Sequence, residues 1–166
     1  MSGPPGAGKT TVAGLIAALS PRSVHVEADR FFESIKSGYV DPWKPESHEQ
    51  NTKVMRIVGD VAAAYAHAGY FTIVEGIVIP RWFLAPLTEQ LWDAGHEVAY
   101  AVLRAPLELC LARCDSVPRD VVEEIWHEFA DLGELEFHAV DSSADEPDSA
   151  VEEILAGLGA RFGLQR

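Results

Sequence analysis

The sequence lacks any apolar run of about 18 or more residues, so we expect no membrane-spanning segment and no association with a membrane. It also lacks the basic-then-apolar layout of a secretory signal at its start, and the cytoplasm is therefore the expected location. Positive charge is scarce, since 13 lysine and arginine residues stand against 26 aspartate and glutamate residues, for a net charge of −13. This balance argues against broad nucleic-acid binding, although it leaves room for a small basic site for phosphates.

Cysteine is also scarce, with Cys110 and Cys114 as the two examples. Their spacing fits neither a zinc-binding pair nor a redox C-x-x-C pair, and on a helix they would lie one turn apart. Free cysteine mostly behaves as a small hydrophobic side chain, so we expect both to fill core or surface positions. The six histidines show no metal-binding spacing either, and we predict no metal other than Mg²⁺.

Alternating strand and helix patterns run along the whole chain, whose 166 residues fit one domain over 1–166. Strands are predicted at 23–27, 71–74, 98–103 and 138–140. Helices are predicted at 9–19, 29–36, 47–67, 80–94, 106–114, 119–131 and 147–158. Residues 38–45 are predicted to form a loop. In the long helix the predicted buried stripe is Val54, Ile57, Val58, Val61 and Tyr65. Because the strands are apolar on both faces, we predict an α/β fold with a parallel sheet covered on both sides.

A phosphate-binding motif, G-x-x-x-x-G-K-T, spans residues 3–10. Its glycines let backbone N–H groups turn inward around phosphates, and the following helix directs its positive end toward them. Lys9 is expected to reach the β- and γ-phosphates, and the hydroxyl of Thr10 to bind Mg²⁺. The predicted nucleotide-binding residues here are Gly3, Pro4, Pro5, Gly6, Ala7, Gly8, Lys9, Thr10 and Thr11. The sequence therefore predicts a nucleoside triphosphate site, most simply for ATP with Mg²⁺.

A phosphate loop normally follows a buried strand, but only Met1 and Ser2 precede Gly3. Loss of a central strand would open the core and leave the backbone groups of its neighbours unpaired. We therefore expect that the start of the given sequence is late, through a misassigned start codon or truncation, and that an apolar run is encoded upstream.

Two acidic residues follow predicted strands at their carboxyl ends, where open parallel sheets bind their ligands. Asp29 comes just after the strand at 23–27 and could accept a proton from a substrate hydroxyl during phosphoryl transfer. It could also cap the helix that follows. Glu75 ends the strand at 71–74, a position suited to holding Mg²⁺ or its water shell, although any strand end can carry a glutamate.

Four arginines could contact phosphates or an anionic substrate, and each could equally be a solvated surface residue. Arg30 and Arg81 lie near predicted strand ends, and Arg81 is the better placed for substrate. Arg113 and Arg119 lie where a lid would close over ATP. Trp43 and Trp82 could wall the substrate site, although a tryptophan more often belongs to the core.

The segments GPPGAGKTT, VEADRFF, PWKPESHEQN, FTIVEGIVIPRWF and VLRAPLELCLARC together resemble small P-loop kinases. The resemblance is strongest to the AAA-type group that includes chloramphenicol phosphotransferase-like, tunicamycin-resistance-like, gluconate-kinase-like and zeta-toxin-like proteins. It covers nearly the whole chain. It implies a three-layer α/β P-loop fold with strand order 2-3-1-4-5, whose first strand is apparently missing here, and ATP-dependent phosphorylation of a hydroxyl on a small molecule.

The resemblance also implies roles for individual residues. Asp29 matches the substrate-binding acid and presumed base, and Gln50 and Asn51 match a helix face that often lines the substrate pocket. Arg113 matches an arginine on the lid side. The lid itself, 114–118, is shorter than in many relatives, which puts the phosphate contact of Arg119 in doubt and could permit wasteful ATP hydrolysis.

The sequence is compatible with three functions. The first is a kinase that acts on a small molecule, with Lys9 and Asp29 as the catalytic residues and Asp29, Arg30, Gln50, Asn51 and Arg81 as the substrate-binding residues. The second is a zeta-toxin-like kinase for a nucleotide sugar, which would need an antitoxin partner. The third is an ATP-binding switch or ATPase without an acceptor. The sequence leaves the acceptor and the oligomeric state undefined.

Overall fold

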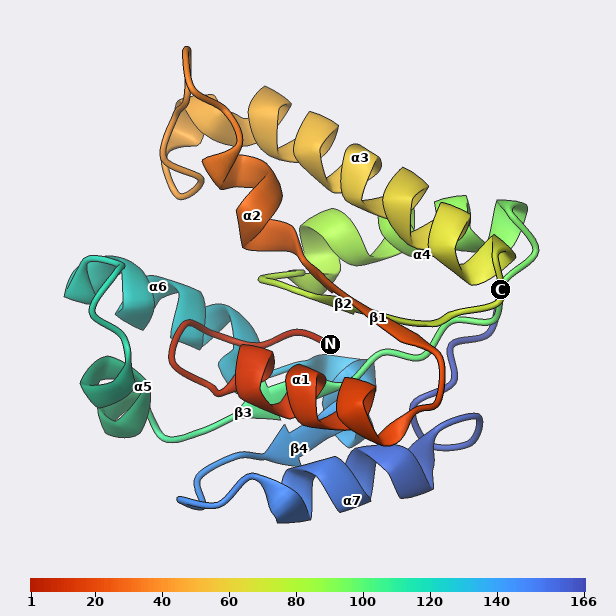
Figure 1. Cartoon of the computed structure of the whole chain (residues 1–166). Coiled ribbons are helices and arrows are strands. Elements are labelled where there is room, and N and C mark those ends of the chain that lie inside the picture. The colour runs from red at the N-terminus through yellow and green to blue at the C-terminus, as the bar shows by residue number, and fades with distance from the viewer.

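The computed structural model describes residues 1–166 and contains four short strands in two parallel pairs. Strand β1 (Ser23–Glu27) pairs with β2 (Phe71–Glu75), and β3 (Val102–Arg104) pairs with β4 (Ala139–Asp141). Figure 1 shows the N-terminus between the two pairs. All pairings are parallel, as expected for strands connected through helices.

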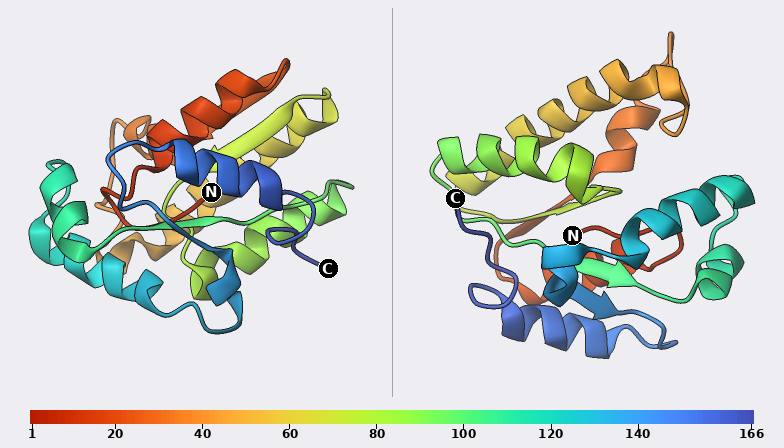
Figure 2. Two further views of the ribbon diagram at one scale, coloured as in Figure 1. Left: turned by 90° about the horizontal axis from the view of Figure 1, so that it is seen from below. Right: turned by 180° about the vertical axis from the view of Figure 1, so that it is seen from behind.

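Seven α-helices and three shorter helical turns connect the strands. The α-helices are α1 (Lys9–Leu19), α2 (Ala28–Glu33), α3 (His48–His67), α4 (Ala85–Asp93), α5 (Leu107–Arg113), α6 (Arg119–Ala130) and α7 (Asp148–Gly157). The turns are η1 (Pro45–Ser47), η2 (Pro80–Leu84) and η3 (Gly133–His138). Helices α1 and α7 cover one face of the strands, while α3, α4 and α6 cover the other (Figure 2). The predicted three-layer α/β fold with a parallel sheet is confirmed.

Met1 and Ser2 connect the two strand pairs. The Ser2 N–H donates to Ala101 O at 2.8 Å, and the Leu103 N–H donates to Ser2 O at 2.8 Å. On the other side, the amino group of Met1 donates to Val74 O at 2.7 Å. The order across the sheet is therefore β1, β2, residues 1–2, β3, β4. This matches the predicted order 2-3-1-4-5, with residues 1–2 in the central position.

The strand predicted at 98–103 is shorter than expected, since β3 begins at Val102. Upstream of it the chain bonds to the C-terminal segment, where the Tyr100 N–H donates to Phe162 O and the Leu164 N–H donates to Val98 O. Ser2 on one side and β4 on the other offer parallel hydrogen-bond partners only from residue 101 onward. Regular strand geometry therefore begins there. Elsewhere the predicted elements form with small shifts at their ends: the helix expected at 29–36 runs from 28 to 33, and the one expected from residue 80 begins as the turn η2.

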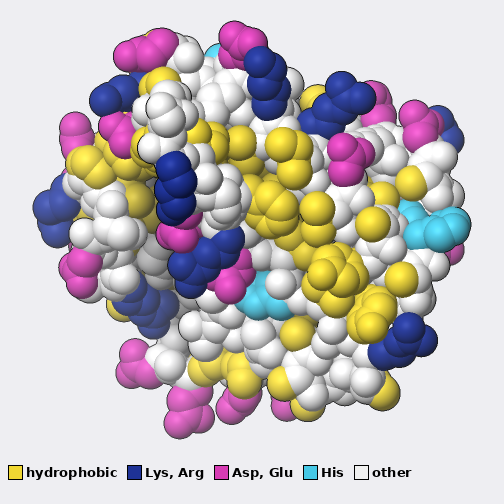
Figure 3. All heavy atoms as spheres, turned by 45° about the horizontal axis from the view of Figure 1, so that its top comes forward, with side chains coloured by type: hydrophobic (Ala, Val, Ile, Leu, Met, Phe, Trp, Pro, Cys, Tyr) yellow, Lys and Arg dark blue, Asp and Glu magenta, His cyan; other side chains and the backbone are white.

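The buried face of α3 differs in part from the predicted stripe. Val54 and Val58 are buried as expected, but Ile57 is 51% exposed and Tyr65 is 42% exposed, so the prediction was wrong for these two. The apolar residues of α3 cover a wider arc than the neighbouring β2 and α4 can bury. Figure 3 shows hydrophobic side chains gathered across the middle of one face, with charged groups around its edge. No helix of the chain is both long enough and apolar enough to cross a membrane.

Candidate phosphate and acceptor site

The phosphate loop, residues 3–10, continues directly from the Met1–Ser2 segment into α1. Gly6 and Gly8 have positive φ values of 78° and 88°, in the left-handed region that glycine adopts without strain. Gly8 is the N-cap of α1, so the loop ends at the positive end of an 11-residue helix. Backbone N–H groups and a helix N-terminus that converge in this way form an anion-binding site.

Two glycines of the loop are required because other backbone segments pass close by. A Cβ on Gly3 would lie 2.2 Å from Leu103 O in β3, and a Cβ on Gly6 would lie 2.3 Å from Cys110 O in α5. Contacts this short are sterically forbidden, so a side chain at either position would displace the loop. The loop is thus wedged between the central strands and α5.

Lys9 is held inside the phosphate loop. Its side chain is buried, with 8% of the residue exposed, and its Nζ donates to Pro4 O at 3.0 Å. Burial lowers the pKa of the Lys9 amine, while the carboxylates of Glu75 and Asp29 act in the opposite direction. A phosphate bound in the loop would add negative charge beside this amine and compensate its loss of hydration.

Thr10 and Glu75, the two predicted metal ligands, are brought together. The Thr10 hydroxyl donates to Glu75 Oε1 at 3.0 Å, and Glu75 is only 3% exposed although it carries a carboxylate. A hydroxyl and a carboxylate are oxygen donors of the kind that Mg²⁺ takes, together with phosphate oxygens and water. The pair fits a magnesium ion at the mouth of the phosphate loop.

Asp29 lies in the first turn of α2, immediately after β1, and its side chain is exposed. Since β1 and β2 are parallel and in register, Asp29 and Glu75 lie at the same edge of the sheet. Burial lowers the pKa of Lys9, and the carboxylates of Glu75 and then Asp29 raise it in opposition. An acceptor bound above this edge could therefore contact Asp29 while its hydroxyl faces the phosphate loop.

Gln50 and Asn51 hold the loop at residues 38–45 in place. Gln50 bonds both backbone groups of Val40, accepting from its N–H at 2.9 Å and donating to its carbonyl at 2.6 Å. The Asn51 Nδ2 donates to Pro42 O at 2.7 Å, while its buried Oδ1 has no hydrogen-bond partner. These contacts fix the shape of the loop, and the substrate contacts of both residues stay predictions.

The two arginines predicted to bind substrate are both ion-paired. Arg30 lies 3.3 Å from Glu27 and 2.9 Å from Glu33. Arg81 pairs with Glu128 of α6 and stacks on Trp82, with its guanidinium carbon 4.5 Å from the ring centroid. Both side chains are exposed.

Arg113 and Arg119, the two arginines predicted to lie in the lid, differ in their surroundings: Arg113 is hydrogen-bonded to the backbone after β4, and Arg119 is exposed. Arg113, the last residue of α5, donates to Ser142 O at 3.1 Å and to Ala144 O at 3.2 Å, so it ties α5 to the segment after β4. Arg119 is exposed at the start of α6, after a short connection over residues 114–118. The predicted phosphate contacts of Arg113 and Arg119 stay predictions.

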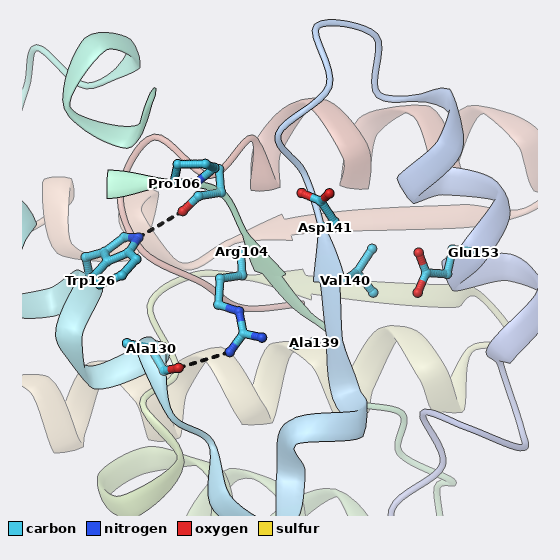
Figure 4. A pocket seen from close by; sticks show the side chains of 9 residues that line it. Arg104, Pro106, Trp126, Ala130, Ala139, Val140, Asp141 and Glu153 are labelled. Atoms are coloured by element: carbon cyan, nitrogen blue, oxygen red, sulfur yellow. Dashed lines mark hydrogen bonds between the residues drawn. The ribbon is translucent and has the colours of Figure 1, made fainter. Parts of the chain in front are cut away.

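A cavity of about 550 Å³ lies beside β3 and β4 and includes no phosphate-loop residue (Figure 4). Its main polar groups already have partners: Arg104 donates to Ala130 O at 3.2 Å and pairs with Glu136, and the Trp126 indole donates to Ala105 O at 2.9 Å. Although this cavity is large, the phosphate loop is the better candidate for the nucleotide.

Two residues near the site were not singled out in the sequence. His25, in the middle of β1, has its Nε2 3.9 Å from Glu75 Oε1, buried and without a hydrogen-bond partner. Tyr39 lies in the 38–45 loop, and burial, followed by the charges of Asp41 and Asp29, raises its pKa. The alternation of β1 could have placed His25 near the strand end, but no pattern in the sequence singled out Tyr39.

A glycine-rich loop between a central parallel strand and a helix, with a buried lysine at the helix start, defines a P-loop nucleotide-binding fold. The comparisons agree with this assignment. The family described as "AAA domain" matches residues 1–131, and the chain belongs to that family. No curated protein matches this chain in sequence.

Several solved structures share the fold. The tunicamycin resistance protein of Deinococcus radiodurans is 22% identical with a TM-score of 0.70, over 99% of this chain and 96% of that one. A gluconokinase from Sinorhizobium meliloti 1021 is 20% identical with a TM-score of 0.66, over 95% and 88%. A shikimate kinase from Acinetobacter baumannii is 21% identical with a TM-score of 0.54, over 93% and 88%. The resemblance to small P-loop kinases is confirmed for family and fold.

Replacing Gly6 by alanine should damage the loop. The new Cβ would meet Cys110 O at 2.3 Å, and φ is 78°, so we expect the free energy of unfolding to fall by about 1–3 kcal/mol and ATP binding to weaken. Gly14→Ala is the matched control, because a Cβ there meets nothing within 4 Å and helix propensity should leave stability unchanged or raise it by up to about 1 kcal/mol. Urea unfolding and ATP titration measure both effects. Equal behaviour of the two variants would contradict the tight-packing account of Gly6.

Proposed function

We propose that this protein is an ATP-dependent phosphotransferase that phosphorylates a hydroxyl group of a small molecule. The observation that carries the proposal is the convergence of three groups at one sheet edge. Lys9 is buried in the phosphate loop, Glu75 is bonded to Thr10, and Asp29 is exposed beside them. A nucleotide-binding switch would need the first two groups, whereas transfer to a hydroxyl also needs a group that can accept the hydroxyl proton, and Asp29 would supply it.

In the proposed reaction, the acceptor oxygen forms a bond to the γ-phosphorus while the bond from that phosphorus to the β–γ bridging oxygen breaks, releasing ADP. The proton of the acceptor hydroxyl passes to the carboxylate of Asp29. Lys9 and the loop N–H groups stabilise the negative charge on the phosphate oxygens during transfer. Thr10 and Glu75 would hold Mg²⁺, which when bound neutralises charge on the β- and γ-phosphates.

The names of the similar structures support an acceptor of this kind. Gluconokinase and shikimate kinase are named for small hydroxyl-bearing substrates, and both align with more than nine-tenths of this chain. The short 114–118 connection leaves limited cover over the phosphates, so water could compete with the acceptor. A phosphotransfer screen with ATP, Mg²⁺ and a panel of hydroxyl compounds tests the proposal directly. ATP consumption that no compound alters would favour the ATPase alternative.

Asp29→Asn should lower turnover by about 100-fold or more, because the amide cannot accept the acceptor's proton. ATP binding should change little, since Asp29 lies outside the phosphate loop. Lys9→Ala should instead abolish activity through loss of the phosphate contacts. The control is Glu89→Gln, which removes an exposed carboxylate of α4 that makes no ion pair. Steady-state kinetics and ATP titration separate the effects, and undiminished turnover in the Asn variant would remove Asp29 as the base.

The charge of the acceptor can also be inferred. Arg30 and Arg81 already pair with glutamates, and Asp29 adds a further negative charge. An anionic acceptor would have to displace a carboxylate from its guanidinium, whereas a neutral polyol would not. Exposed ion pairs are individually weak, so the difference in affinity between a neutral and an anionic acceptor should be small.

A matched pair of acceptors tests this inference. We expect a sugar alcohol to show a KM about fivefold lower than the sugar acid with the same carbon skeleton. Arg81→Gln should leave the KM for the alcohol nearly unchanged. A sugar acid that binds more tightly than its alcohol, with binding lost in Arg81→Gln, would show instead that Arg81 leaves Glu128 to bind a carboxylate.

A further inference from the structure

His25 lies beside Glu75 on the face of the sheet that α1 covers. Strands β1 and β2 are parallel and in register, with His25 opposite Ile73. Side chains alternate along a strand, so His25, Ile73 and Glu75 project to the same side. Ile73 packs in one cluster with Val12 and Ile16 of α1, which identifies that side as the α1 face. The imidazole of His25 is therefore next to the carboxylate of the candidate magnesium site.

One ring nitrogen of His25 is buried without a partner. Its Nε2 makes no hydrogen bond, although the side chain as a whole is 17% exposed. A buried N–H that lacks an acceptor costs free energy, so such a group calls for an explanation. The nearest carboxylate oxygen is Glu75 Oε1, at 3.9 Å, which is about 1 Å beyond the length of a hydrogen bond.

The two oxygens of Glu75 have different surroundings. Oε1 accepts from the Thr10 hydroxyl at 3.0 Å and also faces His25. Oε2 accepts no hydrogen bond and is not enclosed like the unpartnered Nε2 of His25. The terminal torsion of a glutamate is broad, so one donor on Oε1 holds the carboxylate only loosely. A second donor on Oε1 would fix that torsion and keep Oε2 free for a metal ion.

We propose that His25 is a positioning residue for the magnesium site. When the ion binds, the Nε2–H of His25 closes on Glu75 Oε1, and together with Thr10 it holds Oε2 toward the ion. Nε2 donates both in the neutral ring that carries its hydrogen there and in the charged ring, so the role needs no change of protonation. The inference rests on the magnesium site of the proposed function, but not on the acceptor or on Asp29.

Groups that hydrogen-bond to metal ligands affect metal affinity without touching the metal. Removing such a group typically weakens metal binding by about 10–100-fold. A His25 that only fills space beside α1 would behave differently, because its loss would weaken ATP binding equally with and without the ion. The two roles are therefore separated by the ratio of the ATP affinity in Mg²⁺ to that in EDTA.

The test measures this ratio for the full chain by isothermal titration with ATP, with no acceptor present. His25→Leu removes the donor, whereas His25→Gln supplies an amide N–H of similar reach. His48→Leu is the matched control, because His48 is exposed at the start of α3 and its side chain makes no hydrogen bond or ion pair. If the Leu variant does not fold, His25→Asn takes its place, since the shorter amide ends too far from Glu75 to replace Nε2.

We expect His25→Leu to lower the ratio by about tenfold, with little change of the affinity in EDTA. His25→Gln should keep most of the ratio, and His48→Leu should keep all of it. In a Glu75→Gln background, His25→Leu should lower the ratio no further, because the carboxylate through which it acts is gone.

An unchanged ratio in His25→Leu, or equal losses in Mg²⁺ and in EDTA, would overturn the proposal. A further loss in the Glu75→Gln background would also overturn it, since His25 would then act by another route. An unaltered chain that binds ATP equally well in Mg²⁺ and in EDTA would remove the magnesium site together with this role of His25. Failure of the phosphotransfer screen leaves all these binding results unaffected, so the two failures can be told apart.

Discussion

The structure depends on a few hydrogen bonds made by two residues. Met1 and Ser2 bond to Val74 on one side and to Ala101 and Leu103 on the other, and they form the only backbone ladder between the two strand pairs. Ser2 also bonds through its hydroxyl to both backbone groups of Val78, which positions the chain beyond β2. The phosphate loop begins at the next residue, so the same bonds that join the sheet also anchor the nucleotide site.

Much of this arrangement could be predicted because its causes are local. The G-x-x-x-x-G-K-T pattern fixes a loop whose glycines take left-handed conformations, and the following periodicity fixes α1 at residues 9–19. The apolar runs at 23–27 and 71–74 predicted β1 and β2 nearly to the residue. Asp29 and Glu75 could be placed at one edge because parallel strands end together.

What could not be predicted depends on contacts between distant segments. Ile57 has the right spacing for burial, but it is 51% exposed because it lies outside the arc of α3 that β2 and α4 cover. Arg30 and Arg81 carry the charge of a substrate site, and only the folded chain shows that Glu33 and Glu128 already pair with them. The strand expected at 98–103 was shortened because its pairing depends on residues far away in sequence, which no local pattern contains.

The close approach of Gly6 to the Cys110 carbonyl couples the position of the phosphate loop to that of α5. With no side chain between them, the loop and α5 meet backbone to backbone, and Arg113 fastens the far end of α5 to residues 142–144. Helix α5 is therefore fixed beside the phosphate loop, and a displacement of α5 would displace the loop as well. Helix α6 is anchored as well, because Val122 and Phe129 are fully buried and the Trp126 indole donates to Ala105 O at 2.9 Å. The nucleotide site is therefore bounded on this side by two helices that are both fixed to the body of the sheet.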